Sequence, residues 1–274
     1  MLLAGLAFAA MGAVAKAGAA HFSSVELVFY RSVFGLVSLG LLARLRRWPL
    51  ATGHWRLHLS RGSAGVVSLG LYFHCIGHLP LATAVTLNYT SPLFLALISA
   101  GTQAEPLRGG LVLALVGGFA GVVTLLEPTL GRDQWSEAAM GLASGVLAAV
   151  AYAAVKRLGT GGEPGWRVVF YFTLLSTVAT GAVMLVTGAR PVTAGNLWIV
   201  LGVGATGTLG QVAMTRAYQQ GSALVAGTLS YSTVLFSALL GLTLWGEALS
   251  AGGWLGMALI AAAGVAAARA SARR

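Results

Sequence analysis

The sequence predicts an all-α polytopic membrane protein, with ten transmembrane helices arranged as two inverted five-helix repeats around a central cavity. Three observations predict this fold. Of the 274 residues, 57% are hydrophobic and 9% are charged. The apolar residues gather in ten runs of about 20 residues, and the later runs repeat residues of the earlier ones. Soluble domains carry about 25% charged residues, and a soluble chain of this length could not hide so much apolar surface.

Each run is long enough to cross a bilayer as a helix. Short breaks with turn or charge signals separate the runs, as at Glu127-Pro128 and Arg190-Pro191. A β-barrel is excluded because its strands alternate in hydrophobicity, whereas these runs are continuously apolar. The expected spans are residues 2–20, 24–42, 62–79, 81–100, 108–126, 137–157, 166–187, 196–215, 222–245 and 250–269.

Basic residues set the expected orientation. The net charge is +10, and the arginines cluster in loops between apolar runs, which is typical of a membrane protein and not of a nucleic-acid-binding protein. Thirteen of the 17 Lys and Arg residues fall near the side that holds both termini. The positive-inside rule therefore predicts a bacterial-type plasma (inner) membrane with both termini cytoplasmic. No basic stretch precedes the first apolar run, so we expect a retained helix and not a cleaved signal peptide.

Two stretches of the chain carry an internal repeat. Leu87–Leu97 is echoed by Leu229–Leu239, an offset of 142 residues (229 minus 87), and Lys16 matches Lys156. Chance similarity between apolar segments is the alternative, but the non-aliphatic matches keep their order across five helices. Each half, residues 1–130 and 131–274, holds five spans. An odd number of spans per half predicts that the second half is inverted.

Inverted repeats are typical of secondary transporters, because two such halves can exchange outward-open and inward-open shapes at similar energy. The sequence therefore predicts a carrier of small organic solutes in the lipid bilayer, and not an enzyme. The alternatives are an intramembrane lipid-modifying enzyme, which would need a paired acid or metal cluster, and a non-transporting membrane receptor, which would not need the duplication.

The stretch from Ala84 to Glu105, echoed at Ala226 to Glu247, resembles the drug/metabolite transporter superfamily and its EamA domains. The resemblance covers essentially the whole chain and implies a ten-helix carrier. Asn88-Tyr89 followed by Pro92 is similar to the YddG-type exporters of aromatic and other amino acids. That similarity implies amino acids or related metabolites as the solute. The chain departs from that type in its first helix, where an aromatic such as Trp is expected and Phe8 is the only candidate.

Transporter sites lie near the bilayer midplane at the repeat interface. Pro92 removes a backbone donor there and leaves the Asn88 carbonyl free to accept from a solute ammonium. The alternative is that these polar groups bond the previous turn or join helices. The candidate cavity residues are Tyr72, His74, Asn88, Tyr89, Ser91, Pro92, Tyr152, Gln211, Ser230, Tyr231 and Thr233.

The other charged side chains and the two histidines of the third span are expected to have mainly structural roles. His74 and His78 have metal-ligand spacing, but no third ligand is apparent, so we expect no metal. Arg31 lies two turns inside its span and needs a partner, and Glu26 is the nearest acid in sequence. Lys16 and Lys156 snorkel to headgroups or act as gates. Glu105 and Glu247 are expected to cap the following helices.

Absent motifs limit the energy source. No GxxxxGK[ST] loop is present, so ATP does not power the cycle, and no other cofactor is implied. No Asp or Glu lies in the central part of a span, which favours facilitated diffusion or exchange, with coupling through His74 as the alternative. Only Arg31 comes near a mid-span, so a zwitterion or apolar cation is favoured over a polyanion. We expect a monomer, with a dimer through Gly252-xxx-Gly256 as the alternative.

Overall fold

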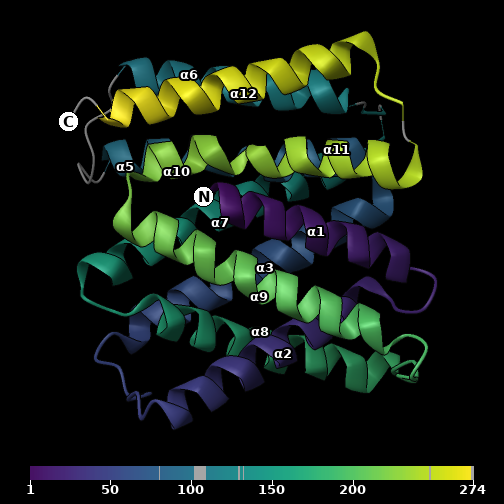
Figure 1. The fold of residues 1–274 in the computed structure, drawn as a ribbon, viewed down its shortest axis with the longest axis vertical. Coiled ribbons are helices and arrows are strands. Elements are labelled where there is room, and N and C mark those ends of the chain that lie inside the picture. Colours follow the sequence, from purple (N-terminus) through teal and green to yellow (C-terminus); the bar gives the residue numbers. More distant parts are fainter. Residues whose placement is uncertain (80, 102–108, 129, 132, 247, 273–274) are drawn as a thin grey trace.

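The computed structural model describes residues 1–79, 81–101, 109–128, 130–131, 133–246 and 248–272 (Figure 1). All regular secondary structure in these ranges is helical. The expected caps Glu105 and Glu247 lie outside the described residues. The helices are α1 (Leu2–Gly18), α2 (Ser24–Leu45), α3 (Trp55–His78), α4 (Leu81–Asn88), α5 (Ser91–Gly101), α6 (Gly109–Leu126), α7 (Trp135–Thr160), α8 (Gly165–Thr187), α9 (Leu197–Gln220), α10 (Ala223–Ser230), α11 (Ser232–Trp245) and α12 (Ala251–Ala272).

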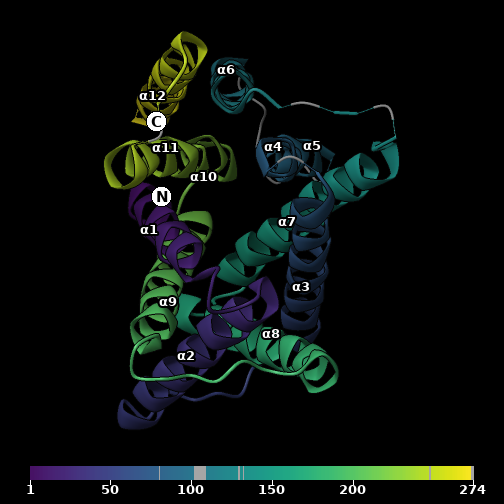
Figure 2. The same cartoon turned by 90° about the vertical axis from the view of Figure 1, so that its right-hand side faces the viewer.

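The helices lie across the long axis of the molecule, one above another (Figure 1). Seen end-on, α6 and α12 form one extreme of the bundle and α2 and α8 form the other (Figure 2). Between these extremes, α1 packs on α9 along one flank and α3 packs on α7 along the opposite flank. The broken helices α4–α5 and α10–α11 lie between the flanks and the α6–α12 pair.

The described residues contain eight helical stretches that are long and apolar enough to cross a membrane. Their outward side chains are apolar, as at Leu185 and Val186, which suits contact with lipid tails. The chain is therefore a polytopic helical membrane protein. The stretches are Ser24–Leu45, Thr83–Gly101, Gly109–Leu126, Trp135–Thr160, Gly165–Thr187, Leu197–Gln220, Ala223–Trp245 and Ala251–Arg269.

Two of the ten expected spans do not meet these criteria. α1 is apolar but has only 17 residues. α3 has 24 residues but begins at Trp55, seven residues before the expected start at Gly62. Its first two turns carry Arg56, His58 and Arg61. The helix begins before the expected span because a span is recognised by its apolar run, and polar turns can extend a helix beyond that run. Arg61, expected at the edge of a loop, is therefore a helical residue.

Two expected continuous spans, 81–100 and 222–245, are each broken into two helices. The first break, at Tyr89 and Thr90, is followed by Pro92, which lacks the backbone N–H that a continuous helix would need. The second break, at Tyr231, has no proline. There the Ser230 and Ser232 hydroxyls donate to carbonyls of the preceding turn, at 2.6 and 2.7 Å, and compete with the backbone donors.

The α6–α12 contact depends on two glycines. A Cβ added to Gly256 would lie 2.7 Å from the Gly121 carbonyl oxygen, and one added to Gly121 would lie 2.9 Å from the Gly256 carbonyl oxygen. The two backbones therefore touch, as small residues allow in membranes. The small residues of these helices thus serve packing within one chain, which was the favoured interpretation of Gly252-xxx-Gly256.

Candidate functional site

Five of the seven tyrosines gather in the middle of the bundle. Tyr152 of α7 stacks on Tyr218 of α9, with ring centroids 4.8 Å apart, and Tyr89 lies 6.3 Å from Tyr231. Tyr72 of α3 lies within electrostatic reach of Tyr89. We call Tyr72, Tyr89, Tyr152, Tyr218 and Tyr231 the tyrosine cluster. The hydroxyls of Tyr218 and Tyr231 are buried and have no hydrogen-bond partner among the described residues.

Two arginines lie beside this cluster. The Arg61 side chain of α3 is 3% exposed, and its guanidinium stacks over the Phe172 ring at 4.1 Å. Arg31 of α2 is partly buried. Both guanidiniums act electrostatically on the Tyr152 phenol, and on each other. We call Arg31 and Arg61 the arginine pair.

Gln211 of α9, and not Glu26, is the partner of Arg31. Arg31 Nη2 donates to Gln211 Oε1 at 3.0 Å. The Glu26 carboxylate instead accepts from the backbone N–H groups of Ser23, at 2.7 Å, and Arg190, at 2.6 Å. Glu26 is therefore occupied in capping α2, because the first turn of a helix presents unpaired N–H donors.

Asn88, an expected cavity residue, is part of a link between helices. Its amide donates to Ser144 Oγ of α7 at 3.0 Å, and Ser68 Oγ of α3 donates to the Ser144 carbonyl at 2.8 Å. Ser144 is fully buried. These bonds join α3, α4 and α7 directly beside the first helix break.

The other expected cavity residues at the two helix breaks are Thr233, Ser230, Ser91 and Pro92. Thr233 of α11 lies close to the Tyr89 side chain, where the two broken helices approach each other. Ser230 bonds its own preceding turn, and Ser91 is buried. Pro92 packs against Gly227 of α10, where an added Cβ would lie 3.0 Å from the Pro92 Cβ.

His74 lies away from the tyrosine cluster. It stacks on His78, with ring centroids 4.2 Å apart, and lines a hollow of about 410 Å³ between α2, α3 and α8. The other lining residues include Ser23, Gly70 and Thr180. The described residues hold no group of three His, Cys, Asp or Glu side chains that could bind a metal ion.

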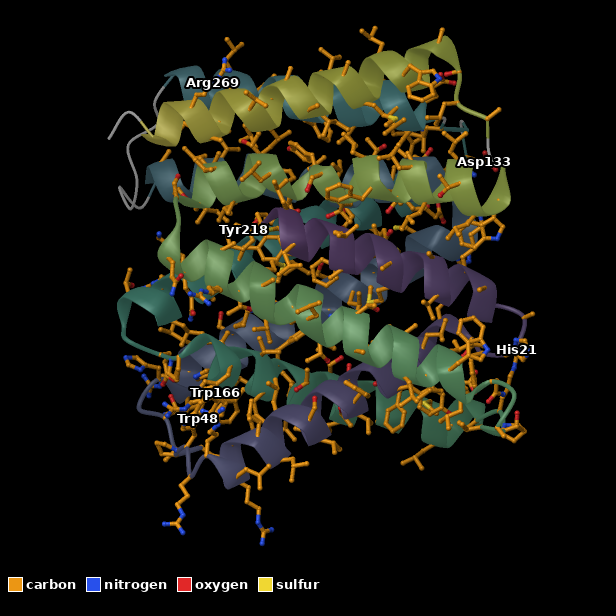
Figure 3. The ribbon with its side chains drawn as sticks, viewed as in Figure 1. His21, Trp48, Asp133, Trp166, Tyr218 and Arg269 are labelled. Carbon is orange, nitrogen blue, oxygen red and sulfur yellow. The ribbon has the colours of Figure 1, made fainter. Side chains whose placement is uncertain are left out.

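A buried acid organises the end of the bundle at which Trp48, Trp166 and Arg269 lie, which we call the basic end (Figure 3). His21 and Asp133 lie at the opposite end. At the basic end, the Glu163 side chain is 3% exposed and accepts from Arg167 Nη1 at 2.9 Å. Thr52 donates to the same carboxylate, and His58 Nε2 lies 3.6 Å from it.

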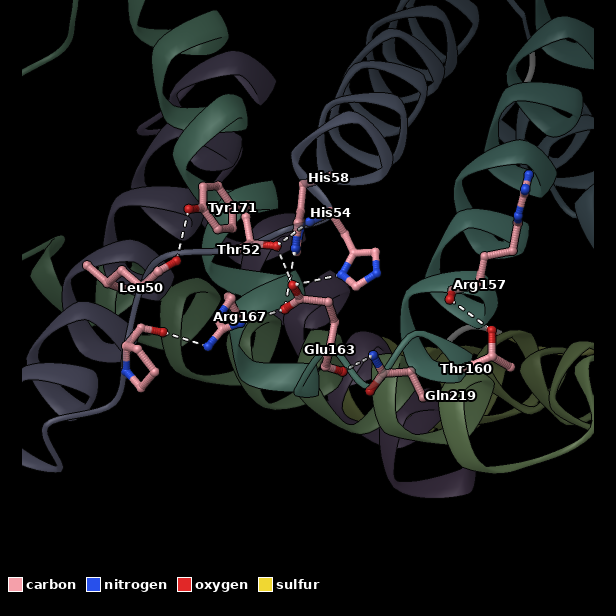
Figure 4. A network of polar contacts seen from close by, with 11 residues as sticks. Leu50, Thr52, His54, His58, Arg157, Thr160, Glu163, Arg167, Tyr171 and Gln219 are labelled. Atoms are coloured by element: carbon pink, nitrogen blue, oxygen red, sulfur yellow. Dashed lines mark hydrogen bonds and ion pairs between the residues drawn. The ribbon is translucent and has the colours of Figure 1, made fainter.

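This Glu163 network joins the 46–54 loop, which connects α2 to α3, to the start of α8 (Figure 4). Arg167 also donates to the Pro49 carbonyl at 2.7 Å, and the Tyr171 hydroxyl donates to the Leu50 carbonyl at 3.0 Å. Gln219 of α9 donates to the Glu163 carbonyl at 3.0 Å. The basic end is thus closed by bonds between segments far apart in the chain.

The two lysines each lie near the C-terminal end of a helix, Lys16 in α1 and Lys156 in α7. Lys156 Nζ donates to the Gly221 carbonyl, between α9 and α10, at 2.5 Å. Lys16 Nζ lies 4.5 Å from the centroid of the Trp245 ring at the end of α11. Lys16 therefore contacts the other half of the chain, and Lys156 contacts a turn of its own half.

Sequence reasoning missed Arg61, Tyr218 and the Glu163 network. Arg61 falls at the edge of an apolar run, so it was assigned to a boundary. Tyr218 follows Arg216 near a helix end, where an interfacial aromatic is ordinary. Glu163 lies in a Gly-rich turn, and only its burial reveals its role. Polar residues that continue a helix beyond its apolar run are the signal that could have found Arg61.

These features define a polytopic helical membrane protein with broken helices around a polar centre. The sequence profile of the EamA-like transporter family matches residues 1–126 and 135–267. The chain belongs to this family, which lies in the drug/metabolite transporter superfamily.

Named relatives extend over most of the chain. It is 31% identical to the pseudopaline exporter CntI of Pseudomonas aeruginosa over 246 residues, which cover 90% of this chain and 86% of the relative. It is 27% identical to a riboflavin transporter of Rhizobium johnstonii, covering 96% and 87%. A crystal structure with a TM-score of 0.82 and 22% identity covers 99% of this chain and 96% of its own, which shows the shared fold.

Proposed function

We propose that this protein is a secondary transporter that exports small organic solutes, amino acids or related metabolites, by alternating access. The halves are residues 1–130 and 131–274, inverted relative to each other, and α1 and α3 cross the membrane with the eight longer apolar stretches. The location is a bacterial-type inner membrane with the basic end in the cytoplasm, since basic residues mark the cytoplasmic side. The family and its exporter relatives support this proposal.

The observation that carries the proposal is a set of contacts that occur twice, about 141 residues apart (for example 172 minus 31). Gly62 of α3 packs on Leu175 of α8, and Gly204 of α9 packs on Phe34 of α2. The two contacts are equivalent under the repeat. Gly62 corresponds to Gly204 (62 plus 142), and Phe34 corresponds to Leu175 (34 plus 141). A duplicated chain with two-fold internal symmetry accounts for this pairing.

Further contacts repeat at the centre. Gly65 packs on Phe172 and Gly207 packs on Arg31, again at matching positions. Gly145 of α7 packs on Thr90 at the first helix break, and Gly5 of α1 packs on Ser232 at the second. Two equivalent halves meeting at broken helices suit a solute site that opens to either side in turn.

The test is counterflow in liposomes that contain the purified protein and excess unlabelled amino acid. A carrier exchanges solute, so uptake of labelled amino acid should exceed that of empty vesicles and should fall when the internal amino acid is omitted. Panels of single amino acids and riboflavin would be run in parallel. Absence of flux for all of them would contradict the transporter proposal, and flux without counterflow would contradict alternating access.

Opening of the basic end can be tested separately. Thr52→Cys with Glu163→Cys, in a Cys75→Ser background, would join the α2–α3 loop to the α7–α8 loop after oxidation. We expect oxidation to stop counterflow and reduction to restore it. The single variants Thr52→Cys and Glu163→Cys are the controls, and they should respond to neither treatment. Equal flux in the oxidised and reduced double variant would mean that this end does not open.

A further inference from the structure

The arginine pair has no acidic counter-ion among the described residues. The Asp and Glu residues that the structure describes lie in the first turn of a helix or between helices, and they are Glu26, Glu127, Asp133, Glu137 and Glu163. Arg61 makes no hydrogen bond or ion pair with any described residue, and Arg31 is bonded only to the neutral Gln211. A buried or partly buried charge without a counter-ion is unfavourable, so a fold that keeps two such arginines gains little stability from them.

The surroundings of the pair offer donors. The carbonyl oxygen of Gln211 is already bonded to Arg31, and its amide Nε2 is buried without a partner. The Tyr218 hydroxyl is likewise buried and unpartnered. Phe172 covers one face of the Arg61 guanidinium, which leaves the N–H groups at the edge of the guanidinium plane for an anion.

Glycines give the arginines their positions. A Cβ added to Gly65 would lie 2.5 Å from Arg61 Nη1, and one added to Gly207 would lie 2.9 Å from Arg31 Cδ. Gly65 and Gly207 occupy equivalent positions in the two halves, 142 residues apart (207 minus 65). The equivalent of Arg31 in the second half is Phe172. Both charges therefore come from the first half, although the space that holds them is duplicated.

We propose that Arg31 and Arg61 bind two carboxylate groups of the transported solute, which is therefore a small dicarboxylate or an amino acid derivative with at least two carboxylates. A guanidinium binds a carboxylate through two parallel N–H···O bonds. Gln211 and Tyr218 supply further donors, and the Tyr152–Tyr218 stack forms an aromatic wall for the carbon skeleton. This inference rests on the proposed function. It proposes a solute with net negative charge, whereas the sequence alone favoured a zwitterion or an apolar cation.

The first experiment measures binding to the purified protein by thermal shift. The probes are succinate, glutarate and L-glutamate, each compared with its mono-amide at equal ionic strength. We expect the dicarboxylates to raise the melting temperature more than the amides do. Arg31→Gln and Arg61→Gln should each weaken dicarboxylate binding by about tenfold or more. Arg216→Gln, which changes an exposed arginine at the end of α9, is the matched control and should bind as the wild type does.

A second measurement separates binding from a structural role. Without solute, Arg61→Gln should melt at the same or a higher temperature than the wild type, because it removes an unpaired buried charge. Arg61→Lys should keep the charge but lose the two-bond geometry, so it should bind dicarboxylates more weakly than the wild type does. A lower melting temperature for Arg61→Gln, together with unchanged dicarboxylate binding by Arg61→Lys, would overturn the proposal.

The outcomes also distinguish this inference from the transporter proposal. Counterflow of neutral solutes, with no stabilisation by any dicarboxylate, would overturn the dicarboxylate site and leave the transporter intact. Stabilisation by dicarboxylates that depends on the arginine pair, without flux of any solute, would support the site and contradict transport.

Discussion

Arg31 in α2 and Gln211 in α9 are joined by a hydrogen bond of 3.0 Å across 180 residues of sequence. The bond connects the two halves of the chain at the polar centre. It also fixes the orientation of the Gln211 amide, because its carbonyl oxygen must face the guanidinium and its Nε2 must then face the other way. One neutral side chain thus both supports a partly buried cation and keeps a buried donor free.

Gln211→Leu should destabilise the protein by about 1.5–3 kcal/mol, the usual contribution of a hydrogen bond to a charged group, because Arg31 loses its polar partner. Thermal unfolding in detergent would measure the change. A matched control exists at the end of the same helix, where Arg216 Nε donates to Gln220 Oε1 at 3.0 Å in an exposed position. Gln220→Leu should change stability by less than about 0.5 kcal/mol. Equal effects of both variants would show that burial of the Arg31 bond is unimportant.

Tyr231 provides a second test, because its ring and hydroxyl have separable roles. The side chain is fully buried against α6, where an added Cβ at Gly118 would lie 2.8 Å from the ring. Tyr231→Ala should therefore cost about 3–5 kcal/mol through the cavity it leaves. Tyr231→Phe keeps the ring and should leave stability nearly unchanged while lowering counterflow, if the unpartnered hydroxyl contacts solute. Wild-type counterflow in Tyr231→Phe would remove this hydroxyl from the site.

Much of the fold could be predicted from the sequence because a lipid solvent requires long apolar helices, and length and composition suffice to find them. The sequence aligns Tyr89 with Tyr231 as equivalent residues of the repeat, but it predicted both spans as continuous helices. The break at Tyr231 itself was not predicted. It depends on serine hydroxyls that bond the backbone, and the same residues are compatible with a continuous helix.

The candidate site could be predicted less well, because contacts between distant helices decide it. Gln211 and Tyr152 were expected to line the centre, and both lie beside the arginine pair. His74 was expected there too, but it lines a separate hollow between α2, α3 and α8. A polar residue inside a helix can face any neighbour, and the sequence does not determine the rotation of the helix. Arg61 was missed because its burial depends on where α3 packs on α8.

The α6–α12 contact gives a prediction about packing. Gly256→Ala should destabilise the protein by about 1–3 kcal/mol, because the new methyl group would lie 2.6 Å from the Leu125 backbone nitrogen and must push the helices apart. Gly117→Ala in α6 is the control, since an added Cβ there meets nothing within 4 Å. Alanine also favours a helix over glycine, so the control should be neutral or stabilising. Thermal unfolding of both variants checks the difference, and an unchanged Gly256→Ala variant would contradict this close contact.

The last prediction concerns Glu163, whose carboxylate accepts from Thr52 and Arg167 at the basic end. Burial acts to raise the pKa of this carboxyl, but the Thr52 hydrogen bond and the Arg167 charge together hold the pKa below its ordinary value of 4.5. A carboxyl whose pKa is lowered by folding stabilises the native state in its ionised form. This contribution is complete above pH 4.5 and is lost as the pH falls through the lower folded-state value.

Glu163→Gln should therefore be less stable than the wild type by about 1–3 kcal/mol at neutral pH, because the partly buried Arg167 guanidinium loses its anionic partner. Below pH 4.5 the wild type should lose this advantage, and the two melting temperatures should converge. Melting curves from pH 7 to pH 3 would measure the convergence. Asp133→Asn, which changes an exposed acid at the opposite end, should follow the wild type throughout. A constant difference between Glu163→Gln and wild type over this range would mean that the ionised carboxylate does not hold the basic end closed.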